Sequence, residues 1–246
     1  MGKLSEDEMI EELKKIDTPT VGNVVATYPG NPLCLEIYDP WYGSWYTDTT
    51  ICCMFPELGV KVGYAVTCIY SNRSEKYLEV DRWALPDGVR KSKKPVVLVC
   101  HQSYPPELEN RCGLFGGNMT TQYRALGIVA VITDGPMRDL SEIRETGVQY
   151  YSTGVTPGHG PLMLRAVNVP VTVGGMTVTP GDFIHMDAHG AIKFPQGRMG
   201  EVLQNAKRLL EAEAEGRKIF LQPDFSVEKW KEAETRKESR SQRSLY

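Results

Sequence analysis

Two short turns of this chain contain residues that could act together in binding or catalysis. Gly116 and Gly117 precede a helix expected to begin near Asn118, and Arg138 and Asp139 stand in a later turn of the same kind. The start of a helix offers unpaired backbone N–H groups to an anion. An arginine can hold a carboxylate through two hydrogen bonds, and an aspartate can bind a hard divalent cation. If the two turns meet in space, they predict a site for a small carboxylic acid and a metal ion.

Each turn has a simpler interpretation when it is taken alone. Glycines are common in tight connections between a strand and a helix. The Gly-x-x-Gly-Gly order of residues 113–117 matches neither the dinucleotide-binding pattern nor a phosphate-binding loop. Asp139 could cap a helix that begins at Leu140, while Arg138 points into solvent. The sequence leaves these alternatives open.

The elements around the turns predict where the turns lie. Residues 94–100 and 128–133 are apolar runs typical of buried strands, and a helix that closes at Gly127 separates them. Alternating strands and helices of this kind build parallel α/β layers. Ligands of such sheets bind beside the carboxyl ends of the strands. If the two strands are parallel neighbours, the turns at 113–119 and 134–139 face one crevice.

Three histidines have positions that the sequence can interpret. His101 follows the strand at 94–100, and it would either enter the same crevice as a proton donor or bond to a loop carbonyl. His185 and His189 lie in the C-terminal hairpin region, where solvated side chains are expected.

The remaining elements complete an α/β fold class. A capping box at Ser5 and Glu8 predicts an N-terminal helix. The β-branched and aromatic residues of 60–70 predict a strand, and Gly-Gly, Pro-Gly-Asp and His-Gly turns divide 167–195 into antiparallel hairpins. Residues 200–218 form an amphipathic helix pattern. The expected architecture is a parallel-strand core with C-terminal β-hairpins, flanked by N- and C-terminal helices.

One domain is predicted, over residues 1–218, with a charged C-terminal extension over 219–246 that ends in a frayed helix or a disordered tail. A second short helix near the N-terminus is expected to end at Pro29-Gly30. The aromatic segment 31–58 that follows shows no regular element and is interpreted as an insertion or a lid.

Composition excludes several classes of partner. The net charge of −3 gives no electrostatic reason to expect binding to nucleic acid or to a membrane surface. The six cysteines form no disulfide or metal-binding pattern, and the N-terminus lacks the apolar core of a signal peptide. A soluble cytoplasmic protein with a small-molecule partner is expected.

The two turns also resemble a known signature. The stretch GGNMTTQYRALGIVAVITDGPMRDLSEI is similar to that of the RraA-like family. This family includes 4-hydroxy-4-methyl-2-oxoglutarate/4-carboxy-4-hydroxy-2-oxoadipate aldolases and the non-enzymatic regulator of ribonuclease activity A. The pattern is matched by Gly117, the gap 118–137, Arg138-Asp139 and Glu142.

The resemblance covers roughly residues 10–215 and leaves the segment 31–58 and the tail outside. It implies a compact α/β/β domain that assembles as a homotrimer, or as a homohexamer of two trimers, with active sites between subunits.

The resemblance further implies a divalent metal, Mg²⁺ or an ion such as Mn²⁺, held by Asp139 largely through waters, with Glu142 as a second carboxylate. Arg138 would grip the carboxylate of a 2-oxo acid. The same carboxylate would meet the turn at Gly116 and Gly117 and the main-chain N–H groups of Asn118, Met119 and Thr120.

The implied activity is that of a lyase. The metal would act as a Lewis acid on the keto oxygen and stabilise the enolate formed when a C–C bond breaks. Retro-aldol release of pyruvate and decarboxylation of oxaloacetate pass through that same enolate.

One position departs from the aldolase version of the signature. Aldolases usually have an acidic residue where this chain has Gly117, and a glycine can neither order the waters of the metal nor move a proton. A non-catalytic regulator is therefore one alternative, and a hydrolase or isomerase acting on a related acid is another. Against the regulator, this chain keeps Asp139, which the resemblance gives as absent from that protein.

Overall fold

The computed structural model describes residues 4–73 and 80–233, and it forms a large mixed sheet flanked by helices. The strands are β1 (Cys52–Cys53), β2 (Lys61–Ser71), β3 (Val96–Ser103), β4 (Ile128–Thr133), β5 (Gln149–Ser152), β6 (Met163–Val167), β7 (Val171–Val173), β8 (Met176–Val178), β9 (Phe183–Asp187) and β10 (Gly190–Phe194). The helices are α1 (Glu6–Leu13), α2 (Thr18–Val25), α3 (Ala84–Lys91), α4 (Pro106–Glu109), α5 (Gly117–Ala125), α6 (Leu140–Thr146) and α7 (Met199–Phe220), with 3-10 turns η1 (Pro56–Leu58) and η2 (Gln196–Arg198).

The eight-stranded sheet has the order β1-β5-β4-β3-β2-β9-β10, and β6 pairs with β2 beside this path. Strands β2, β3, β4 and β5 are parallel, as expected from the alternation of strands and helices. Val97 faces Ala130 and Cys100 faces Thr133, so the strands predicted at 94–100 and 128–133 are parallel neighbours. Their carboxyl ends share one edge of the sheet, which confirms the premise of the predicted crevice.

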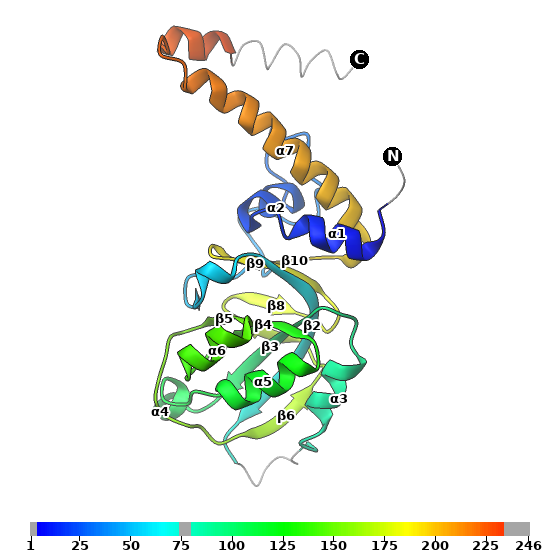
Figure 1. The fold of residues 1–246 in the computed structure, drawn as a ribbon, viewed down its shortest axis with the longest axis vertical. Helices are drawn as coiled ribbons and strands as arrows, with labels where there is room; N and C mark the ends of the chain where they lie inside the picture. Colours follow the sequence, from blue (N-terminus) through cyan, green and yellow to red (C-terminus); the bar gives the residue numbers. More distant parts are fainter. Residues whose placement is uncertain (1–3, 74–79, 234–246) are drawn as a thin grey trace.

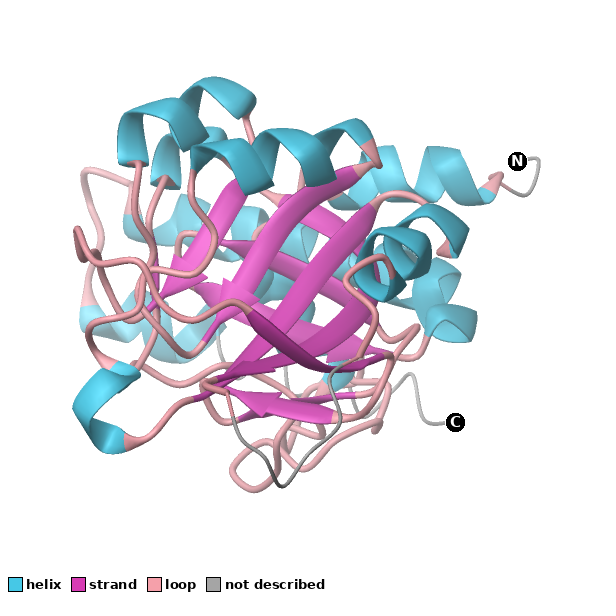
Figure 2. Ribbon diagram, turned by 90° about the horizontal axis from the view of Figure 1, so that it is seen from below, coloured by secondary structure: helices cyan, strands magenta, loops and turns pink. Residues whose placement is uncertain are grey.

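Three apolar clusters hold the layers together. The first lies between the sheet and helices α3, α5 and α6, which cover one face (Figure 1). The second lies on the other face, under the β7–β8 hairpin. The third joins α1, α2 and α7 to β9 and β10 at one end of the molecule. Figure 2 shows the twisted sheet with helices packed along its sides, and the α/β class with C-terminal hairpins and flanking helices is confirmed.

The N-terminal helix begins as its capping box predicts. The Ser5 side chain accepts the Glu8 N–H, and the Glu8 carboxylate accepts from the Ser5 backbone. Helix α2 ends at Val25, before the expected Pro29-Gly30 stop. The backbone N–H groups of Leu35 and Ile37 donate to the carbonyl oxygens of Val24 and Val25. The segment that follows α2 therefore satisfies the last carbonyl groups of this helix. That long-range pairing has no local sequence signal.

The predicted C-terminal helix is present as α7, which continues to Phe220 and so crosses the expected boundary at 218/219. A helical turn at 227–233 follows, and the rest of the tail, 234–246, lies outside the described residues. In the described ranges, no helix is both long enough and apolar enough to cross a membrane.

The expectation of solvated side chains in the last hairpin is wrong for His185. His185 is fully buried, and the neighbouring Asp187 is also buried. The start of α2 covers them: the Thr18 N–H donates to Asp187 Oδ2 at 2.7 Å, and the Thr18 hydroxyl lies 3.0 Å from His185 Nδ1. His185 Nε2 lies 3.1 Å from the Leu13 carbonyl oxygen. Because a carbonyl only accepts, Nε2 carries the proton and Nδ1 accepts from Thr18.

This buried network predicts an acid-sensitive stability. Burial lowers the pKa of His185 in the folded protein. Below about pH 6.5 the unfolded chain takes up a proton that the folded chain resists, so stability falls as the pH drops below that value. We expect His185→Gln to flatten this decline and to cost about 1–3 kcal/mol at pH 7 through weakened hydrogen bonds. The measurement is the free energy of unfolding in urea between pH 7.5 and 5.

The exposed His159 provides the control for this prediction. His159→Gln is expected to keep the parental dependence of stability on pH. If His185→Gln retained the parental slope as well, the acid sensitivity would have another origin.

Candidate functional site

The two turns identified in the sequence meet at the carboxyl edge of the sheet. The Gly117 N–H, at the first turn of α5, donates to Asp139 Oδ2 at 2.9 Å. Asp139 stands at the start of α6 with a left-handed backbone (φ 62°), and its side chain makes no capping hydrogen bond to α6. The carboxylate is therefore directed at the other turn, which rules out its interpretation as a simple helix cap.

The glycine pair is required for this close approach. A Cβ atom at Gly116 would lie 2.3 Å from Asp139 Oδ2 and 2.9 Å from Arg138 Nε. A Cβ atom at Gly117 would lie 2.0 Å from Glu142 Oε2. The structure thus brings all five of these predicted residues together, and the Glu142 carboxylate occupies the space beside the Gly117 α-carbon.

Arg138 has an unused donor at this position. Its Nε is buried and has no hydrogen-bond partner among the described residues. Asp139 Oδ2 lies 3.6 Å away, which is an electrostatic contact but too long for a hydrogen bond. Buried donors are almost always satisfied in folded proteins. An anionic ligand such as a carboxylate would supply the missing partner.

Arg138 and Asp139 line a cavity of about 450 Å³. Its other walls are Leu140, Ser141, Arg144, Val155, Thr156 and Pro157. Arg144 adds a second cation, although its Nε is paired with Glu57 Oε1 at 2.8 Å. Sequence reasoning missed Arg144 and the 155–157 loop. A usable signal existed, because this Thr- and Pro-containing loop, flanked by Gly154 and Gly158, follows the carboxyl end of the next parallel strand, β5.

The first turn of α5 offers fewer N–H groups than the sequence suggested. The Thr120 N–H donates to the Gly116 carbonyl at 3.0 Å, and the Thr120 hydroxyl donates to the same oxygen at 2.9 Å. Asn118 and Met119 remain at helix positions whose N–H groups lack a partner within the helix. An anion at this turn would therefore meet Asn118 and Met119.

His101 is hydrogen-bonded to Asp134 and not to Arg138 or Asp139. Its Nδ1 bonds to Asp134 Oδ2, and Asp134 Oδ1 accepts the Gln102 N–H at 2.7 Å. The hydrogen bond to Asp134 raises the pKa of His101. His101 lies at the carboxyl edge of β3, but it is not among the residues that line the Arg138 cavity.

The residues at the two turns fit a divalent metal of the hard, oxygen-binding kind. The Asp139 carboxylate lies against Gly116 and the Glu142 carboxylate lies against Gly117. Within the described ranges, no group of three or more His, Cys, Asp or Glu residues could hold a metal. Mg²⁺ needs no such group, since it commonly binds through one or two carboxylates and several waters.

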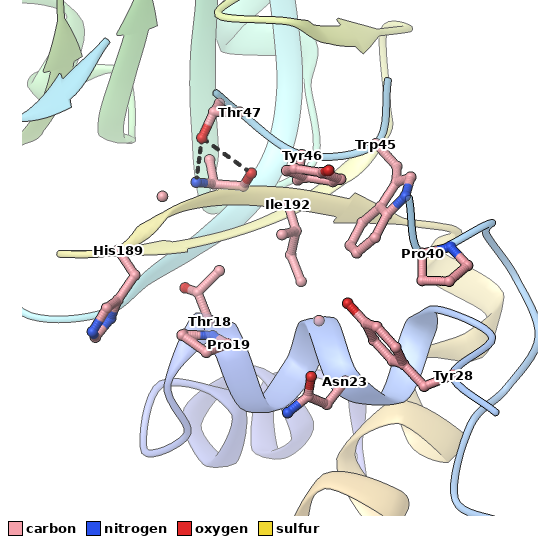
Figure 3. Close-up of a pocket in the computed structure, with 13 residues that line it drawn as sticks. Thr18, Pro19, Asn23, Tyr28, Pro40, Trp45, Tyr46, Thr47, His189 and Ile192 are labelled. Atoms are coloured by element: carbon pink, nitrogen blue, oxygen red, sulfur yellow. Dashed lines mark hydrogen bonds between the residues drawn. The ribbon is translucent and has the colours of Figure 1, made fainter. Parts of the chain in front are cut away.

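The aromatic segment lines a separate cavity of about 320 Å³ between α2 and β10 (Figure 3). Trp45 and Tyr46 form one wall, and Tyr28 directs its hydroxyl into the space from the α2 side. Thr47 anchors the segment, because its hydroxyl accepts the Ala191 N–H at 2.9 Å. Within one chain, the segment therefore packs on β10, and it contributes no lining residue to the Arg138 cavity.

The fold and the site together define an α/β protein with two converging turns at the carboxyl edge of its sheet. The model of the RraA-like family, described as Aldolase/RraA, matches residues 42–192, which is more than half of the chain. The chain belongs to the RraA-like family.

Curated relatives carry aldolase names at low identity. The chain is 33% identical over 86 residues to a putative 4-hydroxy-4-methyl-2-oxoglutarate aldolase of Halalkalibacterium halodurans, which is 35% of this chain and 41% of that protein. It is 31% identical over 91 residues to the 4-hydroxy-4-methyl-2-oxoglutarate aldolase of Thermus thermophilus, covering 37% of this chain and 56% of that protein. The chain thus spans about half the length of the curated relatives it matches.

A solved structure shares the fold. RraAS2 of Streptomyces coelicolor, described as an unusual member of the RNase ES inhibitor RraA protein family, superimposes with a TM-score of 0.66 at 22% identity. The superposition covers 88% of this chain and 99% of that one.

Proposed function

We propose that this protein is a divalent-metal-dependent lyase that cleaves a C–C bond of a small 2-oxo acid. Pyruvate release by retro-aldol cleavage and decarboxylation of oxaloacetate are the two reactions of this class that the site favours. The observation that carries the proposal is the convergence of the turns, with Gly117 N–H on Asp139 and the unsatisfied Arg138 Nε beside Gly116. The aldolase names of the relatives support it.

Each residue at the turns has a role in this proposal. Arg138 would bind the carboxylate of the acid, and the N–H groups of Asn118 and Met119 would complete the contact. Asp139 and Glu142 would hold Mg²⁺ or Mn²⁺. The metal, when bound, would supply Lewis-acid stabilisation of the charge that develops on the keto oxygen. The 450 Å³ cavity beside Arg138 and Asp139 is large enough for a small acid and its ordered waters. Neither α5 nor Glu142 lines this cavity, so in this proposal the acid extends from it past Arg138 toward the first turn of α5.

The Glu142 carboxylate could take the role of the acidic side chain that is missing at Gly117. The Glu142 carboxylate lies where a side chain at position 117 would begin, so it could order water beside the metal in place of the acidic residue that aldolases usually have there. His101 is held by Asp134, and a role for it as the proton donor requires a substrate that reaches beyond the Arg138 cavity. Assembly as a trimer or hexamer with sites between subunits belongs to the same proposal.

The test is turnover of oxaloacetate to pyruvate with Mg²⁺ or with EDTA. We expect pyruvate release to rise at least about tenfold with Mg²⁺, because the developing enolate charge needs the cation. Oxaloacetate also loses CO₂ slowly with Mg²⁺ alone, so protein-free samples at the same metal concentration are subtracted. A rate with protein that equals this blank would remove the lyase and favour a non-catalytic regulator, for which the glycine at position 117 is the supporting observation. Turnover of other acids without C–C cleavage would favour a hydrolase or isomerase.

A further inference from the structure

A further pocket, of about 440 Å³, lies among α3, α5, β2 and β6, and its volume is within the usual range for small-molecule sites. The residues that line this α3–α5 pocket include Tyr70, Arg82, Trp83, Met119, Tyr123 and Leu162. None of its described lining residues belongs to the Arg138 cavity or to the aromatic cavity of Figure 3. A ligand of this pocket would therefore bind independently of the chemistry proposed for the two turns.

Two large apolar side chains of the α3–α5 pocket are left in contact with solvent. Trp83 is 59% exposed and Leu162 is 44% exposed, although both line the pocket. Met119 and Leu164 are less exposed and extend the apolar lining to the core. Apolar surface that remains in water around a cavity is typical of a ligand site.

Arg82 adds a positive charge to this rim. Its guanidinium carbon lies 4.8 Å from the centre of the Trp83 ring, and such stacking restricts the orientation of the planar group. Arg90 is paired with Asp87, whereas Arg82 has no carboxylate partner among the described residues. Because a guanidinium binds a carboxylate through two parallel hydrogen bonds, Arg82 favours an anionic group at the rim.

The inner wall of the pocket contains a pair of phenol groups. Tyr70 and Tyr123 are buried, and both rings pack edge-on against Phe115, with ring centroids 6.0 and 6.4 Å apart. Burial raises the pKa of both phenols, so both keep their protons at neutral pH. The two hydroxyls interact, and only one of them can donate to the other. Among the described residues the second proton has no acceptor, so it favours an oxygen atom of a ligand.

We propose that the α3–α5 pocket binds an aromatic monocarboxylic acid that carries a hydroxyl group on its ring. Arg82 binds the carboxylate at the rim, and the hydroxyl oxygen accepts the second proton of the tyrosine pair. The ring fills the space between them, where the Met119 thioether and the Trp83 indole favour an aromatic body over an alkyl chain. A small dicarboxylic acid fits less well, because the described lining residues other than Arg82 carry no charge.

Isothermal titration calorimetry with 3-(4-hydroxyphenyl)propionate tests the proposal. We expect saturable binding of this acid to the parent protein. The corresponding alcohol, 3-(4-hydroxyphenyl)propan-1-ol, is expected to bind at least about tenfold more weakly, because it lacks the two hydrogen bonds from the guanidinium. An acid that binds no better than the alcohol would overturn the proposal.

Three arginine variants locate the bound acid. Arg82→Gln is expected to weaken binding of the acid at least about tenfold and to leave binding of the alcohol unchanged. Arg90→Gln removes a neighbouring surface cation, and Arg138→Gln alters the other site, so both are expected to keep the parental affinity. Parental affinity in Arg82→Gln, or a loss in Arg138→Gln instead, would contradict the assignment of the pocket.

The tyrosine pair gives a second readout. Replacing both hydroxyls, by Tyr70→Phe combined with Tyr123→Phe, is expected to weaken the hydroxylated acid about threefold to tenfold. Binding of 3-phenylpropionate is expected to stay unchanged, because this acid has no ring oxygen to accept the proton. Circular dichroism checks that the double variant is folded. An equal change for both acids would rule out the proposed contact with the hydroxyl group.

Discussion

The Asp139→Asn variant is expected to lose about a thousandfold in kcat/KM for metal-dependent release of pyruvate, which corresponds to about 4 kcal/mol of transition-state stabilisation. The substitution removes the charge and leaves the shape. Asparagine tolerates the left-handed backbone that Asp139 adopts, and its amide oxygen can still accept the Gly117 N–H. The expected loss therefore reports the carboxylate itself. Steady-state rates over a range of Mg²⁺ concentrations, with the protein-free rate subtracted, measure it.

Asp87→Asn provides the control on the far side of α5. Asp87 lies on α3, is exposed and pairs with Arg90 within its own helix. Its loss is expected to leave kcat/KM within about twofold of the parent, since surface pairs contribute little. Parental activity in a folded Asp139→Asn protein would contradict the assignment of Asp139 as the metal ligand and would remove the basis of the lyase proposal.

The Gly116→Ala variant is expected to lower kcat/KM about a hundredfold, because a displacement of about 1 Å at reacting groups has effects of that size. Gly116 has φ −90°, a backbone conformation that alanine adopts without strain. The added methyl group would instead displace the Asp139 carboxylate and the Arg138 guanidinium, which lie within 3 Å of its position. Both displaced groups are side-chain ends, so the fold is expected to persist, as thermal unfolding can check.

Gly197→Ala is the matched control for this loss. Gly197 lies in η2, where an added Cβ would meet nothing within 4 Å. We expect its kcat/KM to equal that of the parent. If Gly116→Ala were as active as Gly197→Ala, the close packing of the two turns would be irrelevant to turnover, and the site would have to be placed elsewhere.

Gly117 and Glu142 are best understood as a complementary pair. A side chain at position 117 and the Glu142 carboxylate at its present place exclude each other sterically. In this chain the carboxylate in this space comes from Glu142 of α6. Loss of the acidic residue from the first position does not by itself remove the negative charge from the site.

Local patterns in the sequence determined most of the fold. The apolar runs at 94–100 and 128–133 predicted two buried strands, and the capping box at Ser5 predicted the start of α1. These predictions succeeded because hydrophobic periodicity and caps act between residues a few positions apart. The parallel arrangement then followed from the alternation of strands and helices, and it predicted that both turns lie at one edge of the sheet.

The tertiary structure decided the direction of side chains and the burial of polar groups. Asp139 had two open interpretations, and its left-handed backbone together with the Gly117 N–H selected the one across the crevice. His185 was expected in solvent, and α2 buried it. The 155–157 loop lines the Arg138 cavity, and the sequence patterns did not predict this position. In each case the deciding contact joins segments far apart in the chain, and their mutual distance is set by packing of the whole core, which no short stretch of sequence encodes.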